Sequence, residues 1–118
     1  MSEYDVGDRP RIGNHTTTAA ETALGLTPDR LAFKNAAYVD ADPAEVTLRV
    51  RKPDGTVLVY RWPTPAGGES ALVREAAQMG RFYADVPLDQ PGLWRYSLGG
   101  SDDPQAVSSG ELFVRGAV

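Results

Sequence analysis

The chain has 118 residues, of which 42% are hydrophobic and 24% charged, with a formal net charge of -4 at pH 7 and no cysteine. This length predicts a single domain, residues 1–118, with a hydrophobic core of its own. The acidic balance disfavours nucleic acid as a partner, because phosphate binding requires a concentrated basic surface, and the lack of cysteine excludes disulfides and thiolate metal sites.

Residues 4–12 predict a first strand interrupted by Pro10, which suits a sheet edge or a bulge because proline cannot donate a ladder hydrogen bond. A stretch rich in Thr and Ala follows, and we expect a short helix over residues 18–24 that ends near Gly25. Residues 31–39 predict a further strand.

The segment 14–35 as a whole has little strand character, which is unusual for so long a run inside a compact β domain. Two interpretations stay open: a helical insertion, or an arm that becomes ordered on a partner. The only histidine, His15, lies in this segment. A Ser-His-Asp site would have to use it, but no serine motif accompanies it, so we expect an exposed loop histidine.

The middle of the chain has the strand period of two. In residues 46–51, three apolar side chains alternate with three polar ones: Val46, Leu48 and Val50 against Thr47, Arg49 and Arg51. This is typical of a half-buried antiparallel strand. Asp54-Gly55 predicts a hairpin turn and residues 56–62 the return strand. Because both faces of that strand carry apolar residues, we expect Leu58, Tyr60 or Trp62 to contact a neighbour such as another subunit.

Residues 71–77 predict a short strand that runs into a turn at Gly80, and residues 81–88 a strand whose apolar face holds Phe82, Ala84 and Val86. After the corner Asp89-Gln90-Pro91-Gly92, residues 93–98 place Trp94 and Tyr96 on one face. Residues 99–104 predict a polar turn, and residues 106–114 the last strand, with Leu112 and Val114 inward and Glu111, Phe113 and Arg115 outward. The pattern predicts an all-β, immunoglobulin-like antiparallel β-sandwich with a short helical insertion near the N-terminus.

We find no constellation that predicts catalysis or a cofactor. Asp40, Asp42, Asp102 and Asp103 fall at predicted strand ends, but their spacing matches no calcium loop, so we interpret them as solvated loop acids. No window is long and apolar enough for a membrane span, and residues 1–5 lack the basic and apolar regions of a secretion signal. We therefore expect a non-enzymatic protein with no metal and no membrane partner.

Two sets of outward residues are candidates for binding a partner. The aromatic set can stack against sugars or fill a partner's pocket, or can cover the core from its other face; it comprises Tyr60, Trp62, Tyr83 and Phe113. Tyr83 and Phe113 are out of phase with the apolar residues of their strands, so we expect them to be exposed. The basic set forms a positive stripe if its strands adjoin, or else an ordinary solvated face; it comprises Arg49, Arg51, Arg81 and Arg95.

Three blocks of sequence carry a family resemblance. They are YDVGD at residues 4–8; DPAEVTLRV at 42–50 with KPDGTV at 52–57; and GRFYADV at 80–86 with LDQPGLWRY at 88–96, followed by GELFV at 110–114. In these blocks the chain resembles the small immunoglobulin-like structural proteins of tailed bacteriophages and prophages. The segment 14–35 departs from that family.

The resemblance implies a non-catalytic virion protein, made in the cytoplasm of a bacterial host. It would decorate the capsid or connect head and tail, in multiple copies, by contacting capsid, connector or tail proteins. Strand addition or docking of an extended arm would hold it there, with residues 14–35 as the candidate arm. The alternative is a β-sandwich module that binds carbohydrate or a cell surface through exposed aromatic residues.

Overall fold

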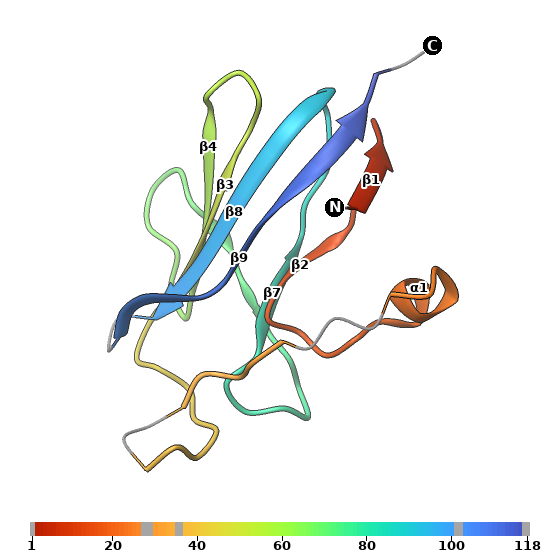
Figure 1. The fold of residues 1–118 in the computed structure, drawn as a ribbon. Coiled ribbons are helices and arrows are strands. Elements are labelled where there is room, and N and C mark those ends of the chain that lie inside the picture. The colour runs from red at the N-terminus through yellow and green to blue at the C-terminus, as the bar shows by residue number, and fades with distance from the viewer. Residues whose placement is uncertain (1, 27–29, 35–36, 101–102, 117–118) are drawn as a thin grey trace.

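The computed structural model describes residues 2–26, 30–34, 37–100 and 103–116. In these residues the protein consists mainly of β-strands, with one short helix (Figure 1). The elements are β1 (Ser2–Asp5), β2 (Arg11–Gly13), α1 (Ala19–Ala23), β3 (Val46–Arg51), β4 (Val57–Trp62), β5 (Ser70–Ala71), β6 (Val73–Arg74), β7 (Phe82–Asp85), β8 (Gly92–Gly100) and β9 (Asp103–Arg115). The predicted β class and the short helix are confirmed. Within the described part of the chain, no helix has the length and apolarity needed to cross a membrane.

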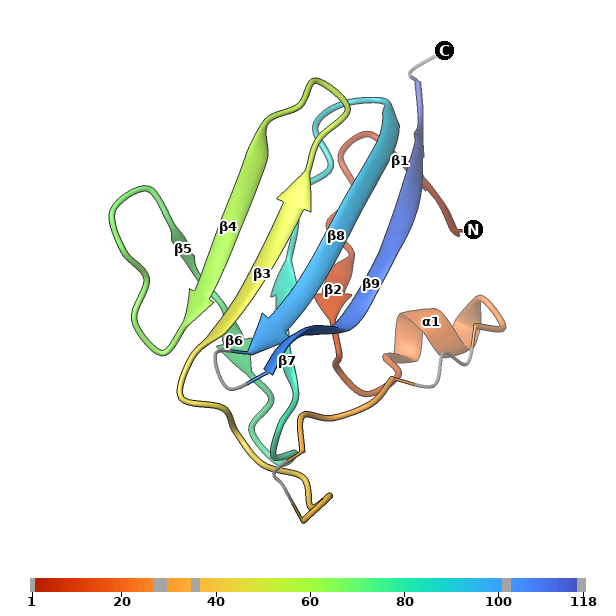
Figure 2. The same cartoon turned by 60° about the vertical axis from the view of Figure 1, so that its left-hand side comes forward.

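The strands form two sheets. The larger has six strands in the order β1-β9-β8-β3-β4-β5, and the smaller has three in the order β2-β7-β6. Figure 2 shows β2, β6 and β7 behind the larger sheet, which curls around them. The smaller sheet is antiparallel, but the larger is mixed, because β1 joins β9 and β5 joins β4 in parallel. The expected purely antiparallel arrangement is therefore wrong at both edges of the larger sheet.

The first predicted strand divides between the two sheets. The chain leaves β1, which pairs with β9, at Asp5, and directly after Pro10 it enters β2, which pairs with β7. β2 ends at Gly13, whose backbone φ is +151°. A Cβ atom there would lie 2.2 Å from the Phe82 carbonyl oxygen, so only glycine allows β2 to approach β7 this closely.

The alternating pattern places the core as predicted. Its inward residues are 0% to 7% exposed: Val46, Leu48 and Val50 of β3, Phe82 and Ala84 of β7 with Val86 after it, Trp94 and Leu98 of β8, and Leu112 and Val114 of β9. Trp94 is fully buried near the start of β8, and its indole Nε1 donates a 3.0 Å hydrogen bond to the Gln90 carbonyl at the preceding corner. Tyr96 points the same way but is only half-buried.

The Asp54-Gly55 hairpin is also confirmed. Lys52 N donates to Thr56 O at 2.8 Å, and the Asp54 carboxylate accepts a 2.9 Å hydrogen bond from Thr56 N. The turn aligns β3 and β4 over six residue pairs, from Val46 opposite Trp62 to Arg51 opposite Val57.

The predicted strand over residues 31–39 does not form. Lys34 makes only an isolated bridge with Asp40, and residues 35–36 lie outside the described part of the chain. Ala32 and Phe33 are both buried although they are consecutive, which a strand with one solvated face does not allow. Instead Phe33 N donates a 2.9 Å hydrogen bond to Gly80 O. The Phe33 ring meets the Phe82 ring edge-on, with 5.9 Å between the two ring centroids.

The predicted turn over residues 99–104 is shorter than expected. β8 continues to Gly100 and β9 begins at Asp103, with register shifts on either side of Gly99; residues 101–102 are not described. Such irregular pairing is typical of a bulge, which lets two strands continue through a bend.

Candidate functional site

Helix α1 stands on the outside of the domain and buries none of its residues. Thr18 caps it: the Thr18 hydroxyl accepts a 3.1 Å hydrogen bond from Glu21 N, and Glu21 Oε1 accepts a 3.0 Å hydrogen bond from Thr18 N. This capping box satisfies donors that the first helical turn otherwise leaves unpaired. The helix therefore depends on its cap and on Glu21 rather than on an apolar face.

Removing the cap is expected to loosen α1 and little else. Thr18→Ala should destabilise the helix by about 1 kcal/mol, because the Glu21 N–H loses its acceptor. Amide hydrogen exchange at Thr22 and Leu24, whose N–H groups donate to helical carbonyls, should become faster. The matched control is Thr22→Ala, which deletes a hydroxyl with no capping role and should leave exchange equal or slower. Equal exchange in Thr18→Ala and the parent would show that the cap does not hold the helix.

Glu21 joins the helix to the rest of the segment. Arg30 binds it with two guanidinium nitrogens: Nη1 lies 3.2 Å from Oε1, and Nη2 contacts Oε2. Burial alone raises the pKa of Glu21, but the hydrogen bonds from Arg30 and Thr18 outweigh it and lower the pKa to about 2. Glu21 is thus an anion whose charge is already neutralised within the protein.

His15 was expected to be exposed, and this is wrong: the side chain is 1% exposed. Its Nε2 lies 3.3 Å from Glu21 Oε1, but neither ring nitrogen has a hydrogen-bond partner among the described residues. The Tyr83 ring meets it edge-on at 6.2 Å. Burial, helped by the charge of Arg30, lowers the pKa of His15 to about 4, so the imidazole is neutral at pH 7.

Asn14 fixes the start of the same segment. Its fully buried amide Nδ2 donates to the carbonyls of Leu31 and Gly80, both at 2.9 Å, and its Oδ1 accepts a 2.8 Å hydrogen bond from Phe82 N. Arg81 adds hydrogen bonds to the carbonyls of Asn14 and Arg30, at 3.1 and 3.0 Å. Asn14 and residues 30–33 are therefore bound to β7 and the turn before it, and α1 projects between them (Figure 1).

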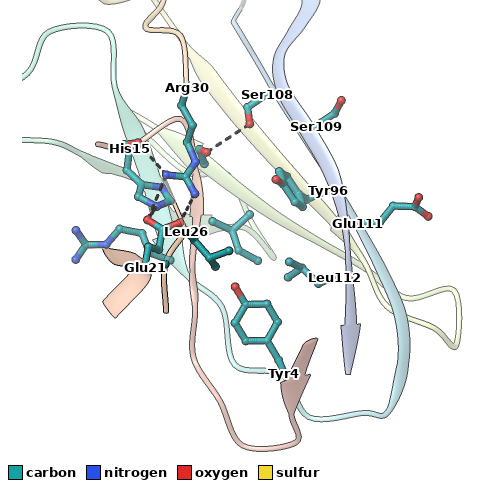
Figure 3. A pocket seen from close by; sticks show the side chains of 14 residues that line it. Tyr4, His15, Glu21, Leu26, Arg30, Tyr96, Ser108, Ser109, Glu111 and Leu112 are labelled. Carbon is teal, nitrogen blue, oxygen red and sulfur yellow. Dashed lines mark hydrogen bonds and ion pairs between the residues drawn. The ribbon is translucent and has the colours of Figure 1, made fainter. Parts of the chain in front are cut away.

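A cavity of about 540 Å³ lies between α1 with its flanking residues and the inner face of the larger sheet. Figure 3 shows Tyr4, Tyr96 and Leu112 on one side of it, and His15, Glu21 and Arg30 on the other. Ser108 lies at one end, where its hydroxyl donates a 3.4 Å hydrogen bond to Gly13 O of β2. This cavity was not predicted, although the Thr18-x-x-Glu21 capping box is a sequence signal that marks one of its walls.

The outer face of the larger sheet brings part of the predicted basic set together. β3 lies between β4 and β8, so one row across the sheet reads Glu111, Arg95, Arg51, Val57, and the next reads Ser109, Ser97, Arg49, Val59. We call Arg49, Arg51 and Arg95 the arginine patch. Arg81 does not belong to it, because its side chain is engaged with Asn14 and Arg30 at the smaller sheet.

The aromatic set divides between three places. Tyr60 and Trp62 point inward and are half-buried against the core; the Trp62 ring lies 4.9 Å from that of Phe82. Together with Leu58 they contact their own domain. Tyr83 lies on the outer side of β7, half-buried beneath the Arg11 guanidinium at 3.8 Å. Phe113 is 40% exposed on the outer face of the larger sheet, opposite Leu93 of β8.

The described acidic residues show no metal site. Asp40 pairs with Lys34 at 2.6 Å, and Asp42 pairs with Arg74 at 2.5 Å. Asp102 and the side chain of Asp103 lie outside the described residues. No group of three metal-binding side chains occurs within the described ranges.

Comparison of the chain with protein-family models, curated proteins and solved structures finds no match.

Proposed function

We propose that this protein is a non-catalytic structural component of a bacteriophage virion, built as an immunoglobulin-like β-sandwich. In this proposal it contacts a capsid, connector or tail protein through the outer face of its larger sheet. The resemblance in the three sequence blocks supports this, because those blocks supply β7, all but the last residue of β3, and parts of β1, β4, β8 and β9. The single observation that carries the proposed docking face is the arginine patch.

The arginine patch is costly for the free protein. Arg51 lies directly opposite Arg95, and like charges at that position are destabilising. Arg95 reaches Glu111 at 3.2 Å, but Arg51 has no ion pair with any described residue. A partner with carboxylates at these positions would relieve the repulsion, so charge complementarity favours an acidic protein surface.

Apolar groups flank the arginine patch. Val57 is 49% exposed and Phe113 is 40% exposed. A charged patch with apolar neighbours is suited to an interface whose centre loses water while its charges set the partner's orientation.

The edge of β4 offers a second mode of contact. β5 pairs only with Tyr60 and Arg61, so among the described residues the backbone of residues 57–59 has no strand on its outer side. An open edge is a template for strand addition by another chain. It adjoins the arginine patch, because Val57 and Val59 are the cross-strand partners of Arg51 and Arg49.

The alternative of a carbohydrate-binding surface finds less support on this face. An open sheet face cannot enclose a sugar and relies on several exposed aromatic rings instead, whereas Tyr60 and Trp62 pack on the core and Tyr83 lies beneath Arg11. Of the predicted aromatic set, this leaves Phe113 on the outer face of the larger sheet.

The charge reversal Arg51→Glu separates binding from folding. It places an opposite charge facing Arg95, so the free energy of unfolding should rise by about 0.5 kcal/mol. Binding to an acidic partner should fall at least about tenfold, because an attraction becomes a repulsion. Urea denaturation measures the first effect. Size-exclusion chromatography and calorimetry with capsid, connector and tail proteins of the same phage measure the second.

The matched control is Lys34→Glu, which makes the same charge change at an exposed cation paired with Asp40, away from the arginine patch. It should leave partner binding unchanged. A parent protein that stays monomeric and binds none of these virion proteins would contradict the proposed function. Equal binding by Arg51→Glu and the parent would contradict the proposed face.

A further inference from the structure

The cavity beneath α1 lies where the larger sheet extends beyond the edge of the smaller one. The larger sheet has six strands and the smaller three, and β2 forms the edge of the smaller sheet on this side. Beyond that edge, α1 and its described flanking residues lie beside β9 instead (Figure 2). The resulting cavity of about 540 Å³ falls within the range of small-molecule sites, roughly 300–1,000 Å³.

The Tyr96 side chain supplies the aromatic floor of this cavity from β8. Its cross-strand partner on β9 is Gly110. A Cβ atom at position 110 would lie 2.8 Å from Tyr96 Oη and 3.0 Å from Cζ, so the ring lies against bare backbone. The flanking inward residues Trp94 and Leu98 are fully buried, whereas Tyr96 stays half-buried. The exposed part of the Tyr96 ring lines the cavity, with Tyr4 and Leu112 beside it (Figure 3).

The opposite wall is polar but electrically balanced. Arg30 and Glu21 neutralise one another, and Arg30 Nη1 also donates to His15 O at 3.3 Å. Arg11 of β2 lies 3.5 Å from the Asp85 carboxylate, and Glu111, on the β9 side of the cavity, is paired with Arg95. His15 is buried, and its ring nitrogens have no hydrogen-bond partner among the described residues. An ionic ligand would therefore meet no unpaired opposite charge among these residues.

We propose that this cavity binds a neutral saccharide. The apolar face of a sugar ring stacks on Tyr96, and its hydroxyl groups exchange hydrogen bonds with the Glu21–Arg30 pair and with Ser108. This combination of an aromatic floor and a neutral, hydrogen-bonding wall suits a ligand that has one apolar face and many hydroxyls. The inference is independent of the proposed docking face, because the arginine patch lies on the other side of the larger sheet.

Nuclear magnetic resonance titration of the whole protein tests this. The probes are glucose, galactose, mannose and N-acetylglucosamine at millimolar concentration, with p-cresol and inorganic phosphate as comparison ligands. At least one sugar should shift the amide signals of Tyr4, Tyr96 and Ser108. Absence of shifts with all four sugars, shifts confined to other surfaces, or binding of p-cresol or phosphate alone would overturn the proposal.

Two variants, one on β8 and one on β9, test the proposed sugar site further. Tyr96→Leu keeps an apolar side chain but removes the ring, and should weaken sugar binding about tenfold. Phe113→Leu makes the same kind of change on the outer face and should not alter the affinity. If Tyr96→Leu does not fold, Ser108→Ala serves instead and should weaken binding severalfold. Equal affinity in the folded cavity variant and the parent would overturn the proposal.

Discussion

Replacing Asn14 by alanine is expected to lower the free energy of unfolding by about 4 kcal/mol. The amide is fully buried and makes three hydrogen bonds to the main chain. Alanine would remove three hydrogen bonds, at about 1 kcal/mol each, and would leave the buried Phe82 N–H without an acceptor, whereas Gly80 O keeps the hydrogen bond from Phe33 N. Urea denaturation measures the loss. Gln78→Ala, an exposed change on the turn before Gly80, is the control and should stay within about 0.5 kcal/mol of the parent.

Asn14→Asp tests the same hydrogen bonds without creating a cavity. One carboxylate oxygen can still accept from Phe82 N, but the other would face two carbonyl oxygens in place of a donor. We expect a loss at least as large as that of Asn14→Ala at neutral pH, and a partial recovery at acidic pH when the carboxyl becomes protonated. An aspartate variant as stable as the parent would show that the Asn14 nitrogen does not hold these carbonyls.

The alternating strands could be predicted because the alternation of apolar and polar residues along each strand indicates which side chains are buried. β3 alternates one buried and one solvated residue, and the structure buries Val46, Leu48 and Val50. Trp94 likewise follows a corner that marks the start of β8. Where one face of a strand is solvated, the period of two fixes both the element and its inward side.

The 14–35 segment could not be predicted in the same way, because its contacts are long-range. The hydrogen bonds of the Asn14 side chain reach residues 17, 66 and 68 positions away. Those partners belong to Leu31, to the turn at Gly80 and to β7, and nothing near Asn14 in sequence identifies them. The burial of His15 follows from the same anchoring, so a polar sequence neighbourhood gave the wrong expectation of an exposed side chain.

The candidate surfaces, likewise, could be predicted from the sequence only in part. Arg49 and Arg51 could be placed on an outer face from β3 alone, but the position of Arg51 opposite Arg95 depends on β8 being the neighbour of β3. Predicting the cavity would require still more long-range information. The cavity combines the pairing of Tyr96 with Gly110, the unequal size of the two sheets and the position of α1. Sequence therefore indicates which side chains point outward, while the sheet order determines which of them meet.

Folding should become less favourable in mildly acidic solution because of His15. The pKa of this group is about 4 in the folded protein, lowered first by burial and then by the charge of Arg30, against an ordinary value of 6.5. The unfolded chain therefore takes up the proton at a higher pH than the folded protein does. The contribution of His15 is complete above pH 6.5, falls as the pH drops towards about 4, and totals about 3 kcal/mol.

The carboxylate of Glu21 makes stability depend on pH over a second, lower pH range. The folded pKa of Glu21 is about 2 against an ordinary 4.5, so its stabilising effect is present above pH 4.5 and is lost between there and about 2. Most of the loss expected between pH 6.5 and 4.5 therefore belongs to His15. His15→Phe should flatten the stability curve in that upper window, whereas Glu21→Gln should keep the upper slope and reduce the lower one.

Two measurements check this expectation. Urea denaturation across the pH range gives the slope for the parent and for both variants. Because the chain has a single histidine, its imidazole proton signal gives the folded pKa directly, and the midpoint should lie near 4 rather than 6.5. A midpoint at or above 6.5 would mean that the approach of Glu21 Oε1 to Nε2, at 3.3 Å, stabilises the charged imidazole more than burial and Arg30 oppose it. His15 would then hold α1 as half of an ion pair, and stability would be lost on raising the pH instead of lowering it.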